Sequence, residues 1–440
     1  MPTPKEYDEL EALLSGSQKP IGPLSGYLGV ALVHMLAGPF AASQLEQQGA
    51  TIIKIETSKG DATRNIPPMT DLEGESVYHA SVNCGTHSID LDLRNKADRE
   101  ILDRLLEKAD FFLHNLSADA LEKLQYGHET IAKKFPHLIN CQISGDGVDG
   151  SKDGAFNENI LAKLGYIRGP QTVVANGVQR SMHSPVSIAD LTTGMQAAFG
   201  IASALADRPR RMARGENGGA FIDVSMVRSS LAMIPQFVGR ATKDGKKLNI
   251  PPLSERSTMM VPFGVFSCKE SEMTICVLSD EMFAKLADVL EFSNEEKELY
   301  SSVQQRIAKQ DDLHTLMLQK LSAKDADEWS RLMKDVGVAC EPVRTITEAM
   351  SNPSIQDQLI PVMSSDGNRM FDVGRAAASN RNYRERESVR GPDPIGRAKA
   401  MVLEALERAK FTGNVYKPSG PELVGAGDLG PEQAPKVAKG

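Results

Sequence analysis

A single ionisable side chain, Asp190, lies within the stretch SPVSIADLTTGMQAAFGIASAL, which runs from Ser184 to Leu205. Apart from Gln196, the other residues there are small, apolar or hydroxyl-bearing, and we expect a helix over 192–206. As a helix N-cap, the carboxylate accepts hydrogen bonds from the first backbone N–H groups. As a nucleophile with an ordinary pKa of about 3.9, it is ionised at neutral pH and needs no general base. Backbone N–H groups at the helix start would then stabilise an oxyanion. Local sequence leaves both interpretations open.

Other motifs that could indicate a catalytic or binding site are less specific. The sequence GDGVDG (145–150) fits GxGxxG and follows a predicted strand, but the residues after it, SKDGAFN, do not begin a helix. This pattern favours a turn over a dinucleotide site, so NAD is not expected. The eight histidines show neither HExxH nor HxxxH spacing, and GxSxG is absent. We therefore expect no metal site and no nucleophilic serine.

Three cations, Lys54, Arg94 and Lys123, lie near the ends of predicted strands or in the helices that follow. Each one alone is typical of a solvated surface charge. Together they would meet phosphate groups at the carboxyl edge of a sheet, where open α/β folds bind their ligands.

The first half of the chain alternates between apolar, β-rich runs and amphipathic runs with helical spacing. This alternation predicts βαβ units and a mostly parallel sheet, that is, an α/β fold. The expected strands are GYLGVALVH (26–34), TIIKIE (51–56), SIDLDL (88–93), DFFLHNL (110–116), LINCQIS (138–144) and FIDVSM (221–226). The expected helices are AGPFAASQLEQQG (37–49), KADREILDRLLEKA (96–109), ADALEKLQ (118–125) and HETIAKKF (128–135). The helix after Asp190 carries small residues on one side, which predicts a closely packed neighbour: Gly194, Ala197, Ala198, Gly200 and Ala204.

The length of 440 residues favours two domains. We expect a large domain to begin with residues 1–227, a smaller one over 228–335, and a return to the large domain over 336–440. In the small domain, VFSC (265–268) and MTICVL (273–278) are predicted strands. The Pro- and Gly-rich tail from about 412 to 440 has little to bury and is expected to be irregular.

Composition excludes several partners. The net charge of −8 argues against nucleic acid and anionic membrane. Five cysteines without CxxC pairing argue against a disulfide framework. The chain has no apolar signal core and no run of about 18 apolar residues, so we expect a cytoplasmic protein.

Seven stretches taken together resemble the class III CoA-transferase family (CaiB/BaiF), which includes formyl-CoA transferases, carnitine CoA-transferases and α-methylacyl-CoA racemases. They cover most of residues 25–380: LAGPFAASQLEQQGATIIKIETSKGDATR (36–64), NCGTHSIDLDLR (83–94), ADFFLHNLSADALEKL (109–124), INCQISGDG (139–147), SIADLTTGMQAAFGIASALADR (187–208), GENGGAFIDVSM (215–226) and EWSRLMKDVGVACEPVRTITEAMSNPSIQDQ (328–358). The resemblance implies a Rossmann-like large domain plus a smaller α+β domain, in a homodimer of interlocked chains.

The resemblance also implies a mechanism, because Asp190 falls on the family's nucleophilic aspartate. Asp190 attacks the thioester of an acyl-CoA, giving a mixed anhydride and then an aspartyl-CoA thioester, from which a second carboxylic acid takes the CoA. Coenzyme A is thus a substrate, and no tightly bound cofactor, ATP or metal is required.

Individual positions match the family's CoA contacts. They are Met35, Leu36 and Ala37 after the first strand, Thr57 where some members carry an arginine, Leu91 and Arg94 in the adenine and phosphate region, Asn115 and Leu116 at the next strand end, and Lys123 as a phosphate contact. Phe156 and Asn157 match the substrate pocket.

Two departures from the family pattern bear on the expected phosphate contacts and on the type of reaction. The usual N-x-x-K-R-S is NCGTHS here, so Thr86 and His87 replace two cations. The racemase His-Asp pair is replaced by Phe156 and Asn157, which speaks against racemisation. The alternatives to CoA transfer are an acyl-CoA isomerase or epimerase and a non-catalytic CoA-binding protein.

Overall fold

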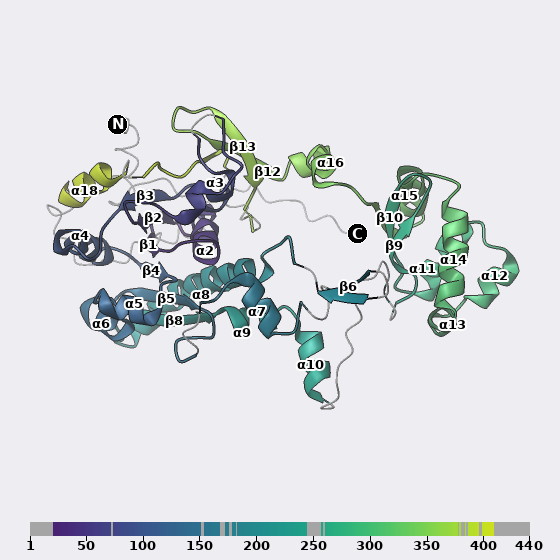
Figure 1. Cartoon of the computed structure of the whole chain (residues 1–440), viewed down its shortest axis with the longest axis horizontal. Helices are drawn as coiled ribbons and strands as arrows, with labels where there is room; N and C mark the ends of the chain where they lie inside the picture. The colour runs from purple at the N-terminus through teal and green to yellow at the C-terminus, as the bar shows by residue number, and fades with distance from the viewer. Residues whose placement is uncertain are drawn as a thin grey trace, which may run out of the picture. The chain divides into compact units, whose positions relative to one another are not determined.

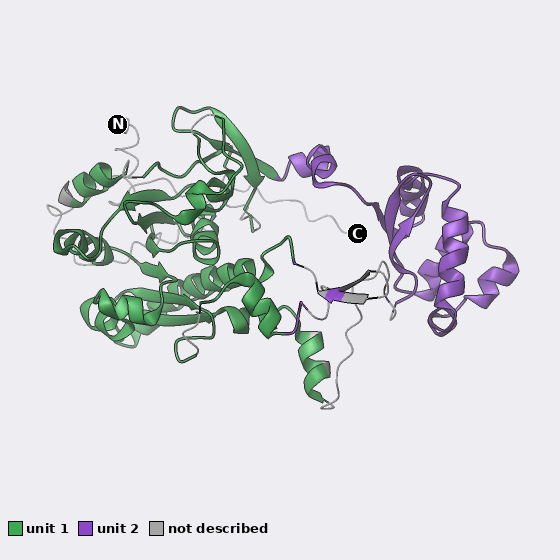
Figure 2. Ribbon diagram, in the orientation of Figure 1, with its two compact units in different colours: residues 1–164, 184–248, 359–440 green, residues 165–183, 249–358 purple. Residues whose placement is uncertain are grey.

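The computed structural model describes residues 21–71, 74–150, 154–167, 172–175, 178–181, 183–243, 257, 260–376, 378–379, 383, 386–395 and 398–408. The tail from about 412 to 440 lies outside these residues. The chain forms two compact units (Figure 2): unit 1 comprises Met1–Leu164, Ser184–Leu248 and Leu359–Gly440, and unit 2 comprises Gly165–His183 and Asn249–Gln358.

These units do not coincide with the expected boundaries at 227 and 335. The return to unit 1 comes only at Leu359, because strand β11 (Ala339–Pro342) pairs antiparallel with β10 (Glu272–Cys276) in unit 2. The residues just after 227 stay in unit 1, because α9 (Met226–Leu231) packs on α8 (Ile188–Ala213). Such pairings join distant segments, so a change in composition along the chain does not reveal them.

Unit 1 is built on a six-stranded parallel sheet of order β3-β2-β1-β4-β5-β8 (Figure 1). The strands are β1 (Leu28–Leu32), β2 (Thr51–Glu56), β3 (His87–Asp90), β4 (Phe111–His114), β5 (Ile139–Ser144) and β8 (Ala220–Ser225). The expected α/β class is confirmed. Strands β1, β2 and β4 are buried along their whole length, as expected when helices cover both faces of a parallel sheet. Strands β2 and β3 are added on one side of β1, and β4 is added on its other side, so the strand order reverses between β1 and β4. Open α/β folds bind their ligands at the carboxyl ends of the strands at such a reversal.

Helices form two layers over this sheet. One core lies beneath α2 (Ala37–Gln47) and α8 and includes Ala41, Leu45 and Ile201. The other core collects apolar residues of the remaining helices, among them α18, which packs against α4 and β3 (Figure 1). These helices are α4 (Lys96–Leu106), α5 (Ala118–Lys123), α6 (His128–Lys134) and α18 (Lys399–Arg408).

The other elements of unit 1 are short. They are η1 (Ala62–Asn65), α3 (Val77–Asn83), α7 (Asn157–Lys163), α9, α10 (Pro235–Lys243) and a three-stranded sheet of order β13-β12-β14, with β12 (Leu359–Met363), β13 (Arg369–Gly374) and β14 (Val389–Arg390).

Unit 2 has its own core around an antiparallel sheet of order β11-β10-β9. It also contains a two-stranded antiparallel sheet formed by β6 and β7. Trp329 and Phe283 are buried in that core. The elements not yet named are β6 (Thr172–Ala175), β7 (Val178–Ser181), β9 (Phe263–Ser267), α11 (Asp280–Val289), α12 (Asn294–Leu299), α13 (Val303–Ala308), α14 (Gln310–Leu321), α15 (Ala326–Asp335), α16 (Ile346–Met350) and α17 (Pro353–Gln356). The expected smaller α+β domain is therefore present.

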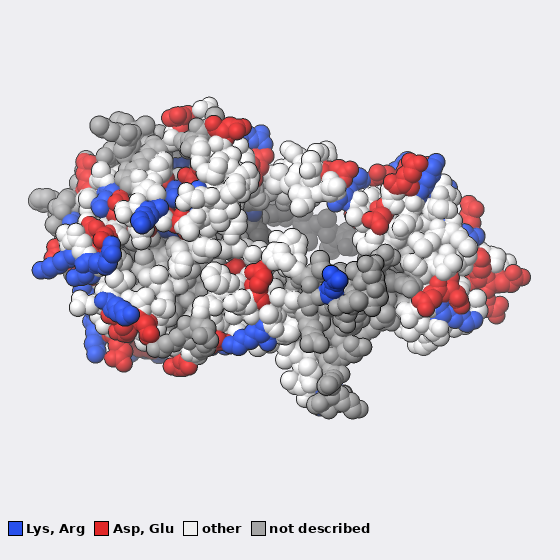
Figure 3. Space-filling model, viewed as in Figure 1, with Lys and Arg blue, Asp and Glu red and all other residues white. Residues whose placement is uncertain are grey.

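Charged side chains of both signs are interspersed on the face of the molecule shown in Figure 3. Among the described residues, no helix is both long and apolar enough to cross a membrane.

Candidate active site

The carboxyl edge of the parallel sheet gathers most of the residues expected to contact CoA. Met35–Ala37 follow β1, Thr57 follows β2, Leu91 and Arg94 follow β3, and Asn115 follows β4. The carboxyl ends of parallel strands meet at one edge of the sheet. The fold therefore brings these segments to the same side, although up to 30 residues separate consecutive strands from β1 to β4. Lys123 lies farther along, exposed in the last turn of α5.

The segment after β1 is fixed to β4. The His34 N–H donates to Asn115 Oδ1 at 3.1 Å, and Asn115 Nδ2 donates to the His34 carbonyl at 2.8 Å. The next residue, Met35, has φ +64°, a left-handed conformation that is uncommon for a side chain other than glycine. Such a backbone persists only where neighbouring contacts impose it. Asn115 is one of those contacts.

Helix α8 begins at Ile188, one turn earlier than the expected start near Thr192, and its N-cap residue is Ser187. Asp190 is therefore the third residue of the helix, and the N-cap interpretation is wrong. The capping bond comes from elsewhere: Asn157 Oδ1 accepts the Ala189 N–H at 2.8 Å. Asn157 is buried and belongs to α7 (Asn157–Lys163), 32 positions before Ala189, so no local pattern would reveal this bond.

The expected oxyanion donors at the start of α8 are also engaged in part. The Ile188 N–H donates to the Val186 carbonyl at 2.9 Å, and the Ala189 N–H is bonded to Asn157. These two N–H groups are therefore already bonded within the protein and do not serve an oxyanion beside Asp190.

Helix α8 packs unusually closely on the start of α2. A Cβ built on Gly194 would lie 2.6 Å from the Ala37 carbonyl oxygen, 2.9 Å from Phe40 Cδ1 and 3.2 Å from the Ala41 nitrogen. The predicted close approach of the small-residue face is confirmed at this position. Asp190 lies four residues before Gly194 and thus projects from the same side of α8. That side faces the segment that follows β1.

We expect Gly194→Ala to destabilise the protein by about 1–3 kcal/mol, because its Cβ would push two backbones apart. Thermal or denaturant unfolding measures the change. Gly200→Ala on the same helix is the matched control, since its Cβ meets chiefly one side-chain methyl, Ile222 Cγ2 at 3.0 Å. Equal unfolding midpoints for the two variants would contradict the close packing at Gly194.

The carboxylate of Asp190 is partly buried, and among the described residues it has neither a hydrogen bond nor an ion pair. Burial and, to a smaller degree, the negative charge of Glu158 raise the pKa of Asp190 to about 6. The sequence-based expectation of an ordinary pKa is therefore wrong, but the group is still mainly ionised at pH 7. A poorly solvated carboxylate without a partner is suited to act as a nucleophile.

Two residues near Asp190 were missed by sequence reasoning. Glu158 is next to Asn157 in α7, and its charge acts on Asp190. Tyr78 in α3 is half-buried, and burial, the charge of Asp190 and that of Asp61 raise the pKa of its phenol. Tyr78 and Asp190 are 112 positions apart, so no spacing signal connects them.

Of the substrate-pocket candidates, Asn157 turns its amide to the start of α8, whereas the Phe156 side chain is exposed. Of the CoA candidates, Leu36, Ala37 and Leu91 are buried, Met35, Asn115 and Leu116 are half-buried, and Thr57, Arg94 and Lys123 are exposed.

The three expected phosphate cations differ sharply. Lys54 is buried, with its Nζ 2.8 Å from Asp61 Oδ2 and 2.7 Å from Asn83 Oδ1, so it is not a phosphate contact. Arg94 is exposed and pairs with Asp92 at 2.9 Å. Thus the structure leaves Arg94 and Lys123 at the surface and places Lys54 in the interior.

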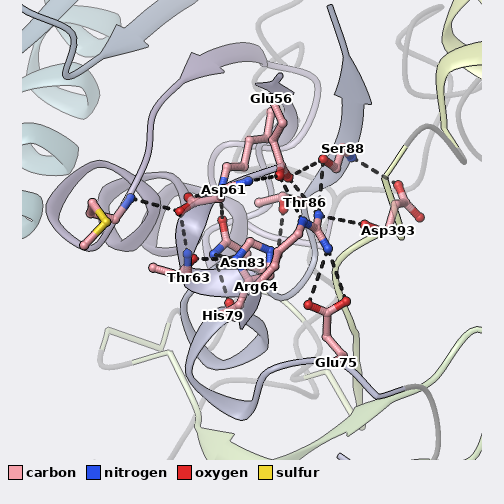
Figure 4. Close-up of polar contacts among 12 residues, drawn as sticks. Glu56, Asp61, Thr63, Arg64, Glu75, His79, Asn83, Thr86, Ser88 and Asp393 are labelled. Atoms are coloured by element: carbon pink, nitrogen blue, oxygen red, sulfur yellow. Dashed lines mark hydrogen bonds and ion pairs between the residues drawn. The ribbon is translucent and has the colours of Figure 1, made fainter. Parts of the chain in front are cut away.

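Lys54 bonds Asp61 and Asn83, which belong to the buried polar cluster shown in Figure 4. Its centre is Arg64, whose guanidinium donates to both Glu56 oxygens, at 2.9 and 2.8 Å, and pairs with Glu75 at 3.1 Å. Arg64 Nη2 also donates to the Asp393 carbonyl at 2.9 Å. The cluster therefore joins the loop after β2 to the returning C-terminal segment.

Comparison with known proteins gives a consistent result. The model of CoA-transferase family III matches residues 24–396. An acetyl-CoA:oxalate CoA-transferase of Acetobacter aceti is 31% identical over 347 residues, covering 76% of this chain and 84% of that protein. A human succinyl-CoA:glutarate CoA-transferase is 26% identical, with 88% of this chain and 87% of that protein covered. The crystal structure of a CaiB/BaiF family protein from Brucella suis has a TM-score of 0.76 at 24% identity and covers 88% of this chain and 99% of its own.

Proposed function

This chain belongs to CoA-transferase family III, and on that premise we propose that it transfers CoA from an acyl-CoA to a carboxylic acid through covalent intermediates on Asp190. The observation that carries the proposal is the environment of Asp190. Its carboxylate is half-buried, has no hydrogen-bond partner among the described residues, and projects from the side of α8 that faces the carboxyl end of β1.

The proposed reaction begins when an Asp190 oxygen attacks the thioester carbonyl and the C–S bond breaks. This step gives an aspartyl mixed anhydride and the CoA thiolate. The thiolate then attacks the aspartyl carbonyl, which releases the first acid and forms aspartyl-CoA. The acceptor acid attacks that thioester to form a second anhydride and the thiolate again. Attack of the thiolate on the acceptor carbonyl forms the new acyl-CoA and restores Asp190.

This scheme uses coenzyme A compounds as substrates and requires no tightly bound cofactor. Each step exchanges one acyl derivative for another, so no external energy source enters. The incomplete solvation of Asp190 supports the scheme, because a carboxylate that is poorly hydrated attacks a carbonyl more readily than one in bulk water.

The acceptor is tested with a panel of acids. The relatives are named for transfer to oxalate, mesaconate and glutarate, all dicarboxylates, so the panel starts with these three. Acetyl-CoA and succinyl-CoA serve as donors, and mass spectrometry detects the new acyl-CoA. Binding of acyl-CoA without formation of any new thioester would support the non-catalytic alternative instead.

An acyl-CoA epimerase predicts a different outcome, namely deuterium incorporation at the α-carbon in heavy water without an acceptor acid. The environment of Asn157 argues against epimerase activity. Its buried amide is engaged with the Ala189 N–H, and neither it nor the exposed Phe156 carries a titratable proton. We expect no such incorporation.

The raised pKa of Asp190 predicts the pH dependence. Because the nucleophile must be ionised, kcat/KM should fall as the pH drops through about 6. Glu158→Gln removes a negative charge that opposes ionisation, so the midpoint should move to lower pH. This shift should be smaller than the full rise in the pKa of Asp190, because burial is the larger cause of that rise. Glu129→Gln, at an exposed position in α6, is the control and should leave the midpoint unchanged. An unshifted midpoint in Glu158→Gln would contradict the assignment.

We also propose that the protein forms a homodimer. Phe199 is 70% and Met195 56% exposed, on the side of α8 opposite Asp190. Large apolar side chains grouped in this way are typical of interfaces. Light scattering should give a molar mass of twice 47.7 kDa for the wild type. Phe199→Glu should lower the molar mass to that of one chain. A monomeric wild type would contradict the proposal.

A further inference from the structure

The left-handed conformation of Met35 is supported from a second side. Its N–H donates to Asp61 Oδ1 over a long distance of 3.4 Å. Asn115 fixes the preceding residue, so the His34–Met35 turn is held by the side chain that follows β4 and by one from the loop after β2. Met35 begins the segment Met35–Ala37, whose backbone is expected to lie against CoA.

Asp61 is itself held in place by several donors. Lys54 Nζ bonds its other oxygen, Oδ2, at 2.8 Å, and the Thr63 N–H donates to Oδ1 at 3.0 Å. The backbone of Asp61 is also fixed, since its N–H donates to Glu56 Oε2 at 2.7 Å. Figure 4 shows Asp61 and Thr63 within the same cluster as Glu56 and Arg64.

Lys54 has no contact with solvent that would explain its charge. Its side chain is 1% exposed and lies on a central strand, where an apolar residue would be usual. Besides Asp61 it reaches Asn83, whose Nδ2 donates to the His79 carbonyl at 2.9 Å. Burial of a lysine costs free energy because the ammonium group loses its hydration. Here Lys54 bonds one residue of the loop after β2 and one residue of helix α3, and so links these two segments.

We propose that Asp61, held by Lys54, is a positioning residue for CoA: it fixes the backbone of Met35 so that the Met35–Ala37 segment is preformed before CoA binds. This inference rests on the proposed function, because it assumes that the segment contacts CoA. Neither Asp61 nor Lys54 touches the substrate. Preformed loops increase affinity because the ligand does not have to order them.

The charge of Lys54 explains why Asp61 is an effective acceptor. Burial opposes the ionised form of Asp61, but Lys54 and the Thr63 N–H outweigh it and lower the pKa of Asp61. The ionised carboxylate has acceptor capacity for Lys54, Thr63 and Met35 together.

Two double variants isolate the bond to Met35. K54M/D61N removes both charges but keeps an acceptor oxygen for the Met35 N–H, whereas K54M/D61L removes the charges and the oxygen. We expect Kd for free coenzyme A, by calorimetry, to stay within about threefold in K54M/D61N and to rise about tenfold or more in K54M/D61L. KM for the acyl-CoA should follow the same pattern, while KM for the acid should change less than about twofold.

The control is an ion pair of similar burial at the opposite end of β1. Asp110 accepts the Leu28 N–H at 2.9 Å and pairs with Arg208 at 2.6 Å. R208M/D110N and R208M/D110L repeat the two substitutions there. They should change the unfolding midpoint, as any structural pair does, and leave Kd for coenzyme A unchanged.

Equal Kd values for K54M/D61N and K54M/D61L would overturn the inference while leaving CoA transfer by the wild type intact. The absence of transfer by the wild type to every acid would instead overturn the proposed function. Hydrogen exchange gives a second test that needs no variant. The Met35 amide should be protected in the free wild-type protein, and exchange as fast as in an exposed loop would also overturn the inference.

Discussion

Asp190→Ala should lower kcat for CoA transfer by about 10⁴-fold or more, because the residue that forms both covalent intermediates is gone. The variant should fold normally, since the carboxylate makes no hydrogen bond to the described residues and caps no helix. Kd for coenzyme A should change little, because the segments expected to contact CoA follow strands β1 to β4, whereas Asp190 is in α8. The measurement is the initial rate of new acyl-CoA formation, with calorimetry of CoA binding alongside.

The control for this substitution lies on the same helix. Asp207 is also a half-buried aspartate of α8, but it is 17 residues from Asp190, more than four turns further along. Asp207→Ala should retain kcat within about twofold. Asp190→Ala with full activity would refute the nucleophile assignment.

Chemical trapping tests the same residue independently. Hydroxylamine attacks an aspartyl anhydride or thioester and leaves a hydroxamate on the aspartate. With wild-type protein and acyl-CoA, peptide mass spectrometry should find this adduct at Asp190 and only when acyl-CoA is present. An adduct at another carboxylate would move the nucleophile to that position.

Arg64→Met should destabilise the protein by about 3–5 kcal/mol, the range expected when one partner of a buried ion pair is removed. Glu56 has a side chain that is 2% exposed and loses two hydrogen bonds in this variant, while Glu75 and the Asp393 carbonyl each lose one donor. Denaturant unfolding measures the loss. Arg94→Met, which removes an exposed arginine paired with Asp92, is the control and should leave the midpoint unchanged.

The pH dependence of stability supplies a further check on Arg64. Burial works against ionised Glu56, but Arg64 and Lys54 outweigh it and hold the pKa of Glu56 at about 2, below the ordinary 4.5. Between these values the unfolded chain binds more protons than the folded protein, so the free energy of unfolding falls as the pH is lowered through this window. In Arg64→Met this slope should become shallower. A slope equal to that of the wild type would contradict the Arg64–Glu56 assignment.

Local sequence patterns were enough to predict the strands of the large sheet. Strand β2 has the bounds that its β-rich run predicts, and β1, β4 and β5 lie inside their predicted runs. Such predictions succeed because the period of apolar residues is a local property that reports burial on one or both faces. The same local pattern identified Asp190 as the one carboxylate in a small-residue stretch, and it predicted the close approach at Gly194.

The roles of the charged residues, in contrast, depend on contacts between distant segments. Lys54, expected at a phosphate, is buried against Asp61, and the helix cap, one of two roles open to Asp190, comes from Asn157. Arg64 reaches a carbonyl 329 positions away, at Asp393. The role of a charge depends on its solvation and its partners, and both are set by which distant segments meet. A pattern within about 20 residues carries no information on that meeting.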